Sequence, residues 1–289
     1  MKLITYRQSG KEAVGVLPDR DRVVPVQALG LRYDSMPELI RGTKGRLFAG
    51  LRRLAESKAE EGEYIPLEKV KLLAPIPRPE QDILCLGVNY AGHAAETAYL
   101  KGGVDFSKAG KPAVYFGKRV NEATAPGDPI PDHSDITSRP DYEAELAVII
   151  GRDAKNVSPA DAGRYIFGYT ILNDVTARDI QYGHTQWYFG KSLDGYTPMG
   201  PWIVTADEFE YPPALEISCR VNGELRQKSN TGLFLHGLSE VISEEIKTDK
   251  LVVLSGPSHA EEVARGIPTT VAAASYNKES SEYIQRELG

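Results

Sequence analysis

A single β-strand, predicted over residues 141–151, constrains this chain more than any other stretch of its sequence. Residues 146–150 are apolar and largely β-branched, and Gly151 closes the run. Because the apolar residues face both sides of the strand, we expect it to be buried between two layers. Side chains alternate along a strand, so Glu143 and Glu145 would point to one face, roughly 6.6 Å apart along the backbone.

Acidic residues gather at the start of this strand and at the end of the next predicted strand, which covers residues 169–174. Two carboxylates at the mouth of a buried strand repel each other and lose solvation unless a cation lies between them. Glu143, Glu145 and Asp174 therefore suit a hard divalent cation with positions left for water and substrate. The alternative, which the spacing alone favours, is a solvated strand rim and an aspartate that caps a helix.

Six sequence blocks, in order between about residues 75 and 231, resemble the fumarylacetoacetate hydrolase family. The blocks are residues 83–96, 141–151, 168–179, 190–194, 198–202 and 221–227. Any one of them would be a weak match, but all six in the family's order are specific. The resemblance, which extends over about residues 1–235, implies an α+β, mainly β fold. It predicts a mixed β-roll of the fumarylacetoacetate hydrolase type with a small N-terminal domain.

The resemblance also implies a chemistry. Glu143, Glu145 and Asp174 would hold Mg²⁺, or Mn²⁺ or Ca²⁺ in its place, and a small anionic 2-oxo acid would bind there. The implied reaction is hydrolysis of a C–C bond in an acylpyruvate or β-diketo acid, with His93 and Glu96 as the pair that activates water. Decarboxylation of an oxaloacetate-like acid and keto–enol isomerisation of a 2-hydroxyhepta-2,4-diene-1,7-dioate-like acid are the alternatives within the family.

His93 and Glu96 lie three residues apart, which on a helical turn places them on one face within hydrogen-bonding reach. A carboxylate partner raises the basicity of an imidazole and fixes its tautomer, as a general base requires. Without the resemblance, two neighbouring side chains on a surface helix would be the more common explanation of this spacing.

The remaining candidates would bind an anionic, oxygen-rich substrate, in roles that the family carries at the same positions. Arg178 suits a substrate carboxylate, and Lys191 and Gln181 suit a developing oxyanion. Tyr90 is a further substrate-binding candidate. From the residues alone, Arg178 could equally pair with a neighbouring aspartate on the surface, and Lys191 could be an ordinary exposed lysine.

Composition divides the chain into three segments. The proline-dense stretch 73–79 separates a small N-terminal domain, residues 1–74, from a catalytic core, residues 75–237. In residues 238–289, helices alternate with strands predicted at 251–254 and 269–274, which is typical of parallel α/β architecture.

This last segment resembles NAD-dependent glycerol-3-phosphate dehydrogenase, but no G-x-G-x-x-G loop occurs in the chain. We therefore expect no NAD binding by that route. The hydrolase family's closing Thr-Gly-Thr-Pro turn is also missing. We interpret the chain as a join of two coding segments, with the crossover between about residues 231 and 240. A metal-binding chimera without activity is the alternative from another functional class.

Charge and composition restrict the partners. The net charge is −6, with both signs scattered along the chain and no basic stripe, so we expect no nucleic acid partner. No apolar run reaches membrane-spanning length, and the first residues lack the apolar stretch of a signal peptide. Two cysteines are normal for a reducing compartment. We expect a cytoplasmic protein, and the resemblance implies a homodimer.

Overall fold

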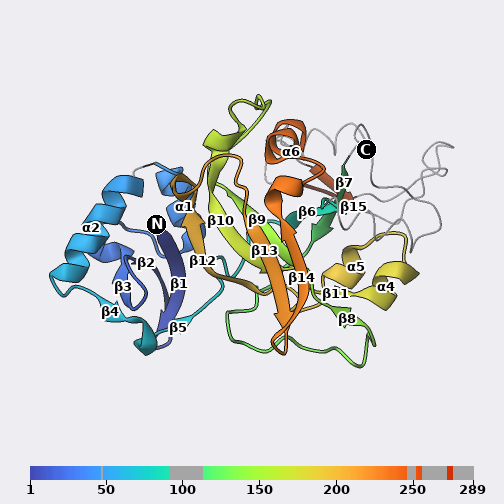
Figure 1. Cartoon of the computed structure of the whole chain (residues 1–289), viewed down its shortest axis with the longest axis horizontal. Helices are drawn as coiled ribbons and strands as arrows, with labels where there is room; N and C mark the ends of the chain where they lie inside the picture. Colours follow the sequence, from blue (N-terminus) through green and yellow to red (C-terminus); the bar gives the residue numbers. More distant parts are fainter. Residues whose placement is uncertain (47, 91–112, 246–251, 256–271, 276–289) are drawn as a thin grey trace.

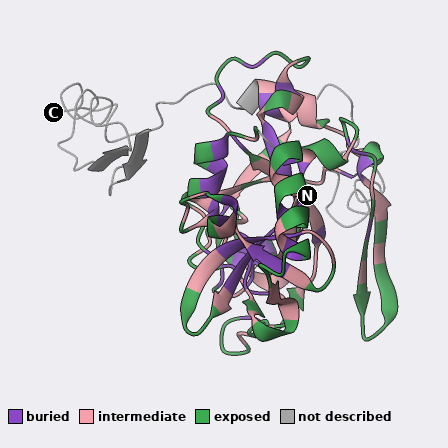
Figure 2. Cartoon of the chain, turned by 90° about the vertical axis from the view of Figure 1, so that its left-hand side faces the viewer, coloured by how far each residue is buried: buried purple, intermediate pink, exposed green. Residues whose placement is uncertain are grey.

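The computed structural model describes residues 1–46, 48–90, 113–245, 252–255 and 272–275. The first of these ranges begins with three antiparallel strands, β1 (Lys2–Gln8), β2 (Lys11–Leu17) and β3 (Arg22–Pro25), as the sequence predicts. Their valine-rich face is buried beneath α1 (Met36–Thr43) and α2 (Phe48–Glu60) (Figures 1 and 2). Helix α2 thus covers one face of the sheet, as its apolar side requires, and Ile4, Tyr6, Leu17 and Val23 are buried in a second cluster on the other face.

One sheet joins the N-terminal strands to the core. Its eight strands include the path β4-β3-β2-β1-β12-β10-β9, with β5 paired to β1. The connection is the antiparallel pairing of β1 with β12 (Met199–Thr205), in which Lys2 lies opposite Val204. The two short strands are β4 (Ile65–Pro66) and β5 (Lys71–Leu72). Backbone hydrogen bonds therefore cross the boundary that we predict at residue 74.

The predicted acidic strand is β9 (Ala144–Ile150), which pairs antiparallel with β10 (Ile166–Asn173). In this register Leu172 lies opposite Glu145, and the backbone N–H of Asp174 donates to the carbonyl of Glu143 at 2.8 Å. The prediction that β9 is buried on both faces is wrong, because most of its residues are only half-buried. The physical reason is that β9 is the last strand on the sheet's path; β10, one strand further in, is the buried one.

Smaller antiparallel pairs complete the core. They are β6 (Ile83–Gly87) with β7 (Val114–Lys118), β8 (Pro140–Asp141) with β11 (Thr176–Ala177), and β13 (Glu216–Val221) with β14 (Glu224–Asn230). Asn222 and Gly223 have φ angles of 51° and 82°, so the predicted type I′ turn between β13 and β14 is confirmed. The short helices α4 (Arg178–Gly183) and α5 (Tyr188–Lys191) follow β11. The 3₁₀ turns span Val26–Leu29, Leu67–Lys69, Ala162–Tyr165, Ala206–Glu208 and Thr231–Leu233.

The architecture is α+β and mainly β, as predicted, with antiparallel ladders throughout the described residues. An isolated parallel bridge links Thr124 and Pro198. None of the helices in the described ranges has the length and apolar character needed to cross a bilayer.

The C-terminal segment begins with α6 (Leu238–Glu245), where the sequence predicts a helix. Its Ile242 is buried against a cluster that includes Ala162 and Ile166 of the core. Strands β15 (Val252–Ser255) and β16 (Ala272–Ser275) pair with each other in antiparallel fashion, so the predicted parallel arrangement is wrong. An antiparallel pair satisfies backbone groups without the crossover and two covering layers that a parallel pair needs. The helices predicted after these strands lie outside the described residues.

Candidate active site

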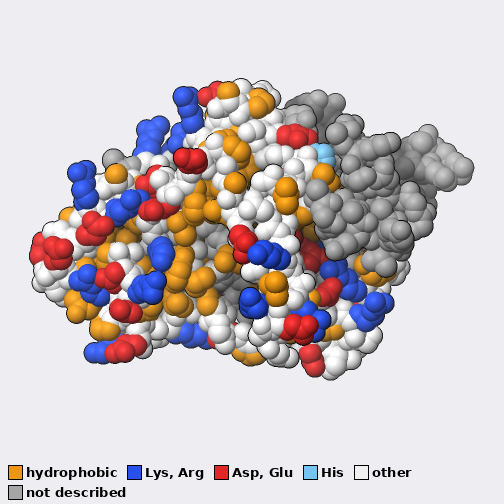
Figure 3. Space-filling model, viewed as in Figure 1, with side chains coloured by type: hydrophobic (Ala, Val, Ile, Leu, Met, Phe, Trp, Pro, Cys, Tyr) orange, Lys and Arg blue, Asp and Glu red, His pale blue; other side chains and the backbone are white. Residues whose placement is uncertain are grey.

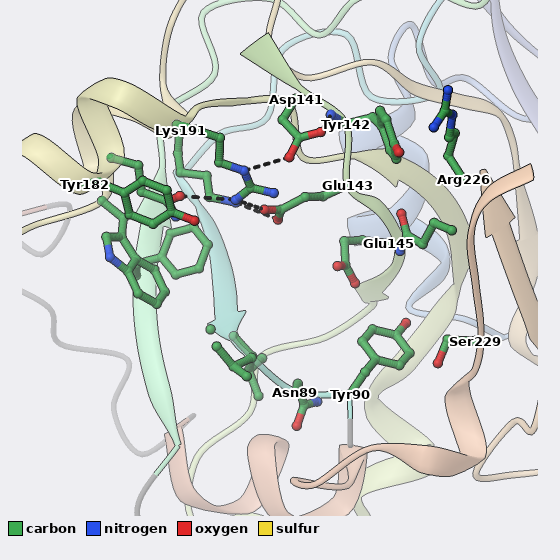
Figure 4. A pocket seen from close by; sticks show the side chains of 18 of the residues that line it. Asn89, Tyr90, Asp141, Tyr142, Glu143, Glu145, Tyr182, Lys191, Arg226 and Ser229 are labelled. Carbon is green, nitrogen blue, oxygen red and sulfur yellow. Dashed lines mark hydrogen bonds and ion pairs between the residues drawn. The ribbon is translucent and has the colours of Figure 1, made fainter. Parts of the chain in front are cut away.

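A cavity of about 440 Å³ opens where the acidic end of β9 meets α4, α5 and the β13–β14 hairpin. The residues after β6, including Tyr90, form another side (Figure 4). Glu143 and Glu145 both line it, as the alternation of side chains along a strand predicts. The sequence candidates Arg178, Gln181 and Lys191 also line the cavity. The chain thus brings together candidates that are far apart in its sequence.

Alternating positive and negative side chains form the floor of this cavity. The Lys191 ammonium lies 2.6 Å from Oε2 of Glu143 (Figure 4) and 2.8 Å from Oδ2 of Asp174. On the far side of Asp174, the Lys118 ammonium lies 2.8 Å from Oδ1. On the far side of Glu143, the Arg178 guanidinium lies 2.6 Å from Oε1. We call these five residues the floor cluster.

Lys191 remains a charged donor despite its burial. Loss of solvent alone would lower the pKa of this ammonium, but Asp174 and Glu143 outweigh burial and raise it. The ammonium also lies 5.2 Å from the centre of the Phe116 ring, a favourable position for a cation. A buried, permanently charged ammonium is suited to stabilising negative charge that develops on a bound molecule.

Lys118 is the residue of the floor cluster that sequence reasoning missed. It closes β7, its side chain is fully buried, and it donates to the backbone carbonyls of Val175, at 3.2 Å, and Lys191. Burial lowers the pKa of this lysine, and the Asp174 carboxylate opposes that effect. The available sequence signal was weak: a single lysine that follows an apolar strand.

Arg178 is held in place by hydrogen bonds to three side chains of the protein. Its Nε donates to Oδ2 of Asp141 at 2.8 Å, and its Nη1 donates to the side-chain carbonyl of the buried Gln181 at 3.1 Å, in addition to its bond to Glu143. These contacts hold Glu143 in place and use the oxygen end of the Gln181 amide. The NH₂ end of that amide is the part that can donate to a bound molecule.

Glu145 differs from Glu143, its neighbour on the same face. Burial, and then repulsion from Glu143 and Asp174, raises its pKa to about 8. The ion pairs among the described residues include none for Glu145, whereas Glu143 has two cations. The buried Tyr90 is its neighbour, and burial followed by the Glu145 charge raises the pKa of the Tyr90 phenol. Tyr90 also packs edge-to-face on Phe234, with ring centroids 4.9 Å apart.

The chemistry of this donor set fits a divalent cation. Within the described residues, no three acidic, histidine or cysteine side chains are already arranged as a metal site, and the Lys191 ammonium lies between Glu143 and Asp174. Yet Glu145 lies beside this cluster, and the ion pairs of the described residues include none for it. A cation beside a desolvated carboxylate is the ordinary way to keep it ionised. The residues therefore suit the ion that the sequence predicts.

Side-chain amides fix the backbone that carries the two glutamates. Asn173 Oδ1 accepts from the N–H of Glu143 at 2.9 Å. The Gln227 amide makes two bonds to Ala144, accepting from its N–H at 2.8 Å and donating to its carbonyl at 2.9 Å. Ala144 lies between Glu143 and Glu145, so the acidic end of β9 is held from both sides. The predicted pair His93 and Glu96 lies outside the described residues.

The sequence matches the family described as "Fumarylacetoacetate (FAA) hydrolase C-terminal" over residues 82–252. The chain belongs to this family. "Oxaloacetate tautomerase YisK" from Bacillus subtilis strain 168 is 37% identical over 84% of the chain and 82% of its own length. The floor cluster and Glu145 are therefore compared below with the reactions of this family.

Solved structures agree with the fold. The fumarylacetoacetate hydrolase from psychrophilic Exiguobacterium antarcticum has a TM-score of 0.68 at 38% identity, covering 86% of this chain and 81% of its own. Maleylpyruvate hydrolase from Sphingobium sp. SYK-6, in complex with manganese(II) ion and pyruvate, has a TM-score of 0.63 at 28% identity, covering 84% and 81%. These relatives differ in reaction, from tautomerisation to hydrolysis.

A second match covers the C-terminal segment. Residues 230–281 resemble the family "NAD-dependent glycerol-3-phosphate dehydrogenase N-terminus". This range overlaps the end of the hydrolase-family match and begins next to the predicted crossover. It includes α6, so part of the dehydrogenase-like sequence packs on the hydrolase-family core through Ile242.

Proposed function

We propose that this protein interconverts the keto and enol forms of a small 2-oxo acid of the oxaloacetate type. The observation that carries the proposal is the floor cluster, in which the charged Lys191 ammonium faces a cavity beside Glu145, a half-buried carboxylate with no ion pair among the described residues. The 37% identity to an oxaloacetate tautomerase supports the choice of reaction. Tautomerisation moves one proton from C3 to the C2 oxygen and leaves the atoms otherwise unchanged.

We propose that Glu143, Glu145 and Asp174 hold a divalent cation, Mg²⁺ or Mn²⁺. When bound, such an ion would supply Lewis-acid polarisation of the 2-oxo group. The chain's own residues have separate tasks. Lys191 and the NH₂ group of Gln181 would donate to the oxygen on which the enolate charge develops. Phe116 and Trp187, which pack edge-to-face at 5.4 Å, line the cavity and would exclude water there.

The base in this proposal is His93, oriented by Glu96, which would take the C3 proton. The same pair favours a second candidate function, hydrolysis of a C–C bond in an acylpyruvate, in which His93 would take a proton from water. The likeness to a maleylpyruvate hydrolase supports that second candidate. Decarboxylation of the same 2-oxo acids shares the enolate and is a third outcome of the same chemistry.

The decisive experiment follows three reactions of one preparation, with Mn²⁺ and with chelator. Enol-to-keto conversion of oxaloacetate is monitored by ultraviolet absorbance, acetylpyruvate cleavage by release of acetate, and oxaloacetate decarboxylation by release of CO₂. We expect Mn²⁺-dependent tautomerisation as the fastest reaction. Faster acetylpyruvate cleavage would favour the hydrolase, and no activity towards either acid would favour the chimera without activity.

We also propose that the protein is a cytoplasmic homodimer. Ile171, in the middle of the central sheet, is 56% exposed. Hydrophobic side chains gather over the sheet between the N-terminal strands and the β13–β14 hairpin (Figure 3). A second copy packed on this face would bury Ile171. Light scattering after size-exclusion chromatography should give a dimer for the parent and a monomer for Ile171→Asp. A monomeric parent would contradict the proposal.

A further inference from the structure

Four cationic side chains line the cavity among the described residues, and they fall into two pairs. Arg178 and Lys191 belong to the floor cluster, and each is already bonded to two carboxylates. A substrate carboxylate that used either one would have to compete with these short, buried contacts. Arg226 and Lys228 are the second pair, and they lie on β14.

The second pair makes ion pairs with exposed glutamates at the surface. Arg226 lies 2.8 Å from Glu224, and Lys228 lies 3.0 Å from Glu216. All four side chains are about half exposed or more, with the two glutamates at 65% and 64%. Exposed pairs of this kind typically contribute less than about 1 kcal/mol, so an incoming anion can replace the glutamates at little cost.

The hairpin that carries this pair is docked on the acidic strand. Arg226 and Lys228 flank Gln227 on β14 and both line the cavity, while Gln227 bonds twice to Ala144 of β9. The two bonds fix the position of the hairpin relative to Glu143 and Glu145. Figure 4 shows Arg226 on the opposite side of the cavity from Lys191. A molecule held at the floor would thus present its far end to the hairpin.

We propose that Arg226 and Lys228 recognise a second carboxylate at the far end of the substrate, so that the site selects dicarboxylic over monocarboxylic 2-oxo acids. This inference rests on the proposed function, because the near end of the substrate is taken to lie at the floor cluster. Guanidinium and ammonium groups bind carboxylates through charge-assisted hydrogen bonds, and the arginine fork can make two of them. Neither residue would take part in proton transfer.

The experiment compares oxaloacetate with its 4-methyl ester, whose far end is neutral, in the Mn²⁺-loaded enzyme. The test variant is Arg226→Gln with Lys228→Gln, and the matched control is Arg220→Gln. Arg220 is an exposed arginine of the same hairpin that does not line the cavity. We expect the double variant to lose roughly 10- to 100-fold in kcat/KM for oxaloacetate, through KM. The ester and the control should change by less than about twofold.

An equal loss on both substrates would overturn the inference, because it would mean that the hairpin only supports the fold of the site. No loss on either substrate would overturn it as well. If the parent enzyme does not turn over oxaloacetate, the proposed function fails separately. Calorimetric binding of 2-oxoglutarate and its 5-methyl ester then decides the inference. Preference for the free acid that disappears in the double variant supports it, and equal affinity contradicts it.

Discussion

The floor and the rim of the cavity handle charge in opposite ways. At the floor, Lys118 and Lys191 are almost fully buried and contact Asp174, whose side chain is 5% exposed. At the rim, Arg226 and Lys228 are 49% and 57% exposed and contact surface glutamates. When one member of a buried ion pair is removed, the other is left as an uncompensated charge. When one member of an exposed pair is removed, water solvates the charge that remains.

This difference in burial indicates which residues have both a structural and a chemical role. Substitutions at the floor should change stability, metal affinity and rate together, since one network serves all three. Substitutions at the rim should change substrate selection with little effect on stability. The two regions therefore make separable predictions, which we give from the largest expected effect to the smallest.

Lys191→Met should give the largest effect. The substitution removes the proposed donor to the enolate oxygen and the cation shared by Glu143 and Asp174. Loss of one such donor typically costs about 10²–10³-fold in kcat. Initial rates of oxaloacetate tautomerisation check this, with the exposed Lys11→Met as the control. A rate within about threefold of the parent would show that Lys191 has only a structural task.

Lys118→Met should give the second largest effect, on stability. The Asp174 carboxylate would keep Lys191 but lose its other cation while remaining buried. Breaking a buried ion pair costs up to roughly 3–5 kcal/mol in free energy of unfolding, and the remaining Lys191 should keep the loss at or below the lower end of that range. Urea denaturation of the metal-free protein measures the change, and Lys11→Met should stay close to the parent. Equal midpoints for the two variants would mean that the floor is not held together by charge.

The pH dependence of stability tests Glu145 in the metal-free protein. Its pKa is about 8 in the folded state and near its ordinary value of 4.5 in the unfolded chain. Between these pH values the folded protein holds a proton that the unfolded chain has released. Stability should therefore fall as the pH rises from about 5 to 8. Thermal melts in chelator should show this fall in the parent and a flatter profile in Glu145→Gln; parallel profiles would argue against a raised pKa.

Glu224→Gln should give the smallest effect. It removes the surface partner of Arg226, and the free energy of unfolding should change by less than about 1 kcal/mol. The freed guanidinium should bind the far carboxylate at least as well as before, so KM for oxaloacetate should stay equal or fall. Urea denaturation and steady-state kinetics measure the two quantities. A clear rise in KM would mean that Glu224 positions Arg226 and does not compete with the substrate.

Sequence reasoning was most successful where the signal is local. The acidic strand, its glutamates on one face and the Asn222-Gly223 turn all depend on neighbouring residues, and each was found. Lys118 was missed because its partners lie far away in the chain: Asp174 is 56 residues on, and Val175 is 57. The partial burial of β9 was not predicted for a related reason, because strand order in a sheet is a property of the whole chain.

The C-terminal segment also shows that local sequence pattern does not predict how strands pair. Its strands and its first helix were found from local pattern, but their antiparallel pairing was not. The helix–strand alternation of a dehydrogenase predicts parallel strands only where the remaining strands of that sheet are present. Whether His93 and Glu96 form a pair stays a prediction from the sequence.

The central claim is that the acidic end of β9 and Asp174 form a divalent cation site. Calorimetric titration of Mn²⁺ into the parent, Glu145→Gln and Glu224→Gln tests it most directly. The two glutamates differ in burial: loss of solvent raises the pKa of Glu145 at the cavity, while Glu224 lies on the exposed hairpin. The account predicts one tight site in the parent and in Glu224→Gln, and its loss in Glu145→Gln. Equal Mn²⁺ binding by Glu145→Gln and the parent, or none by the parent, would contradict it.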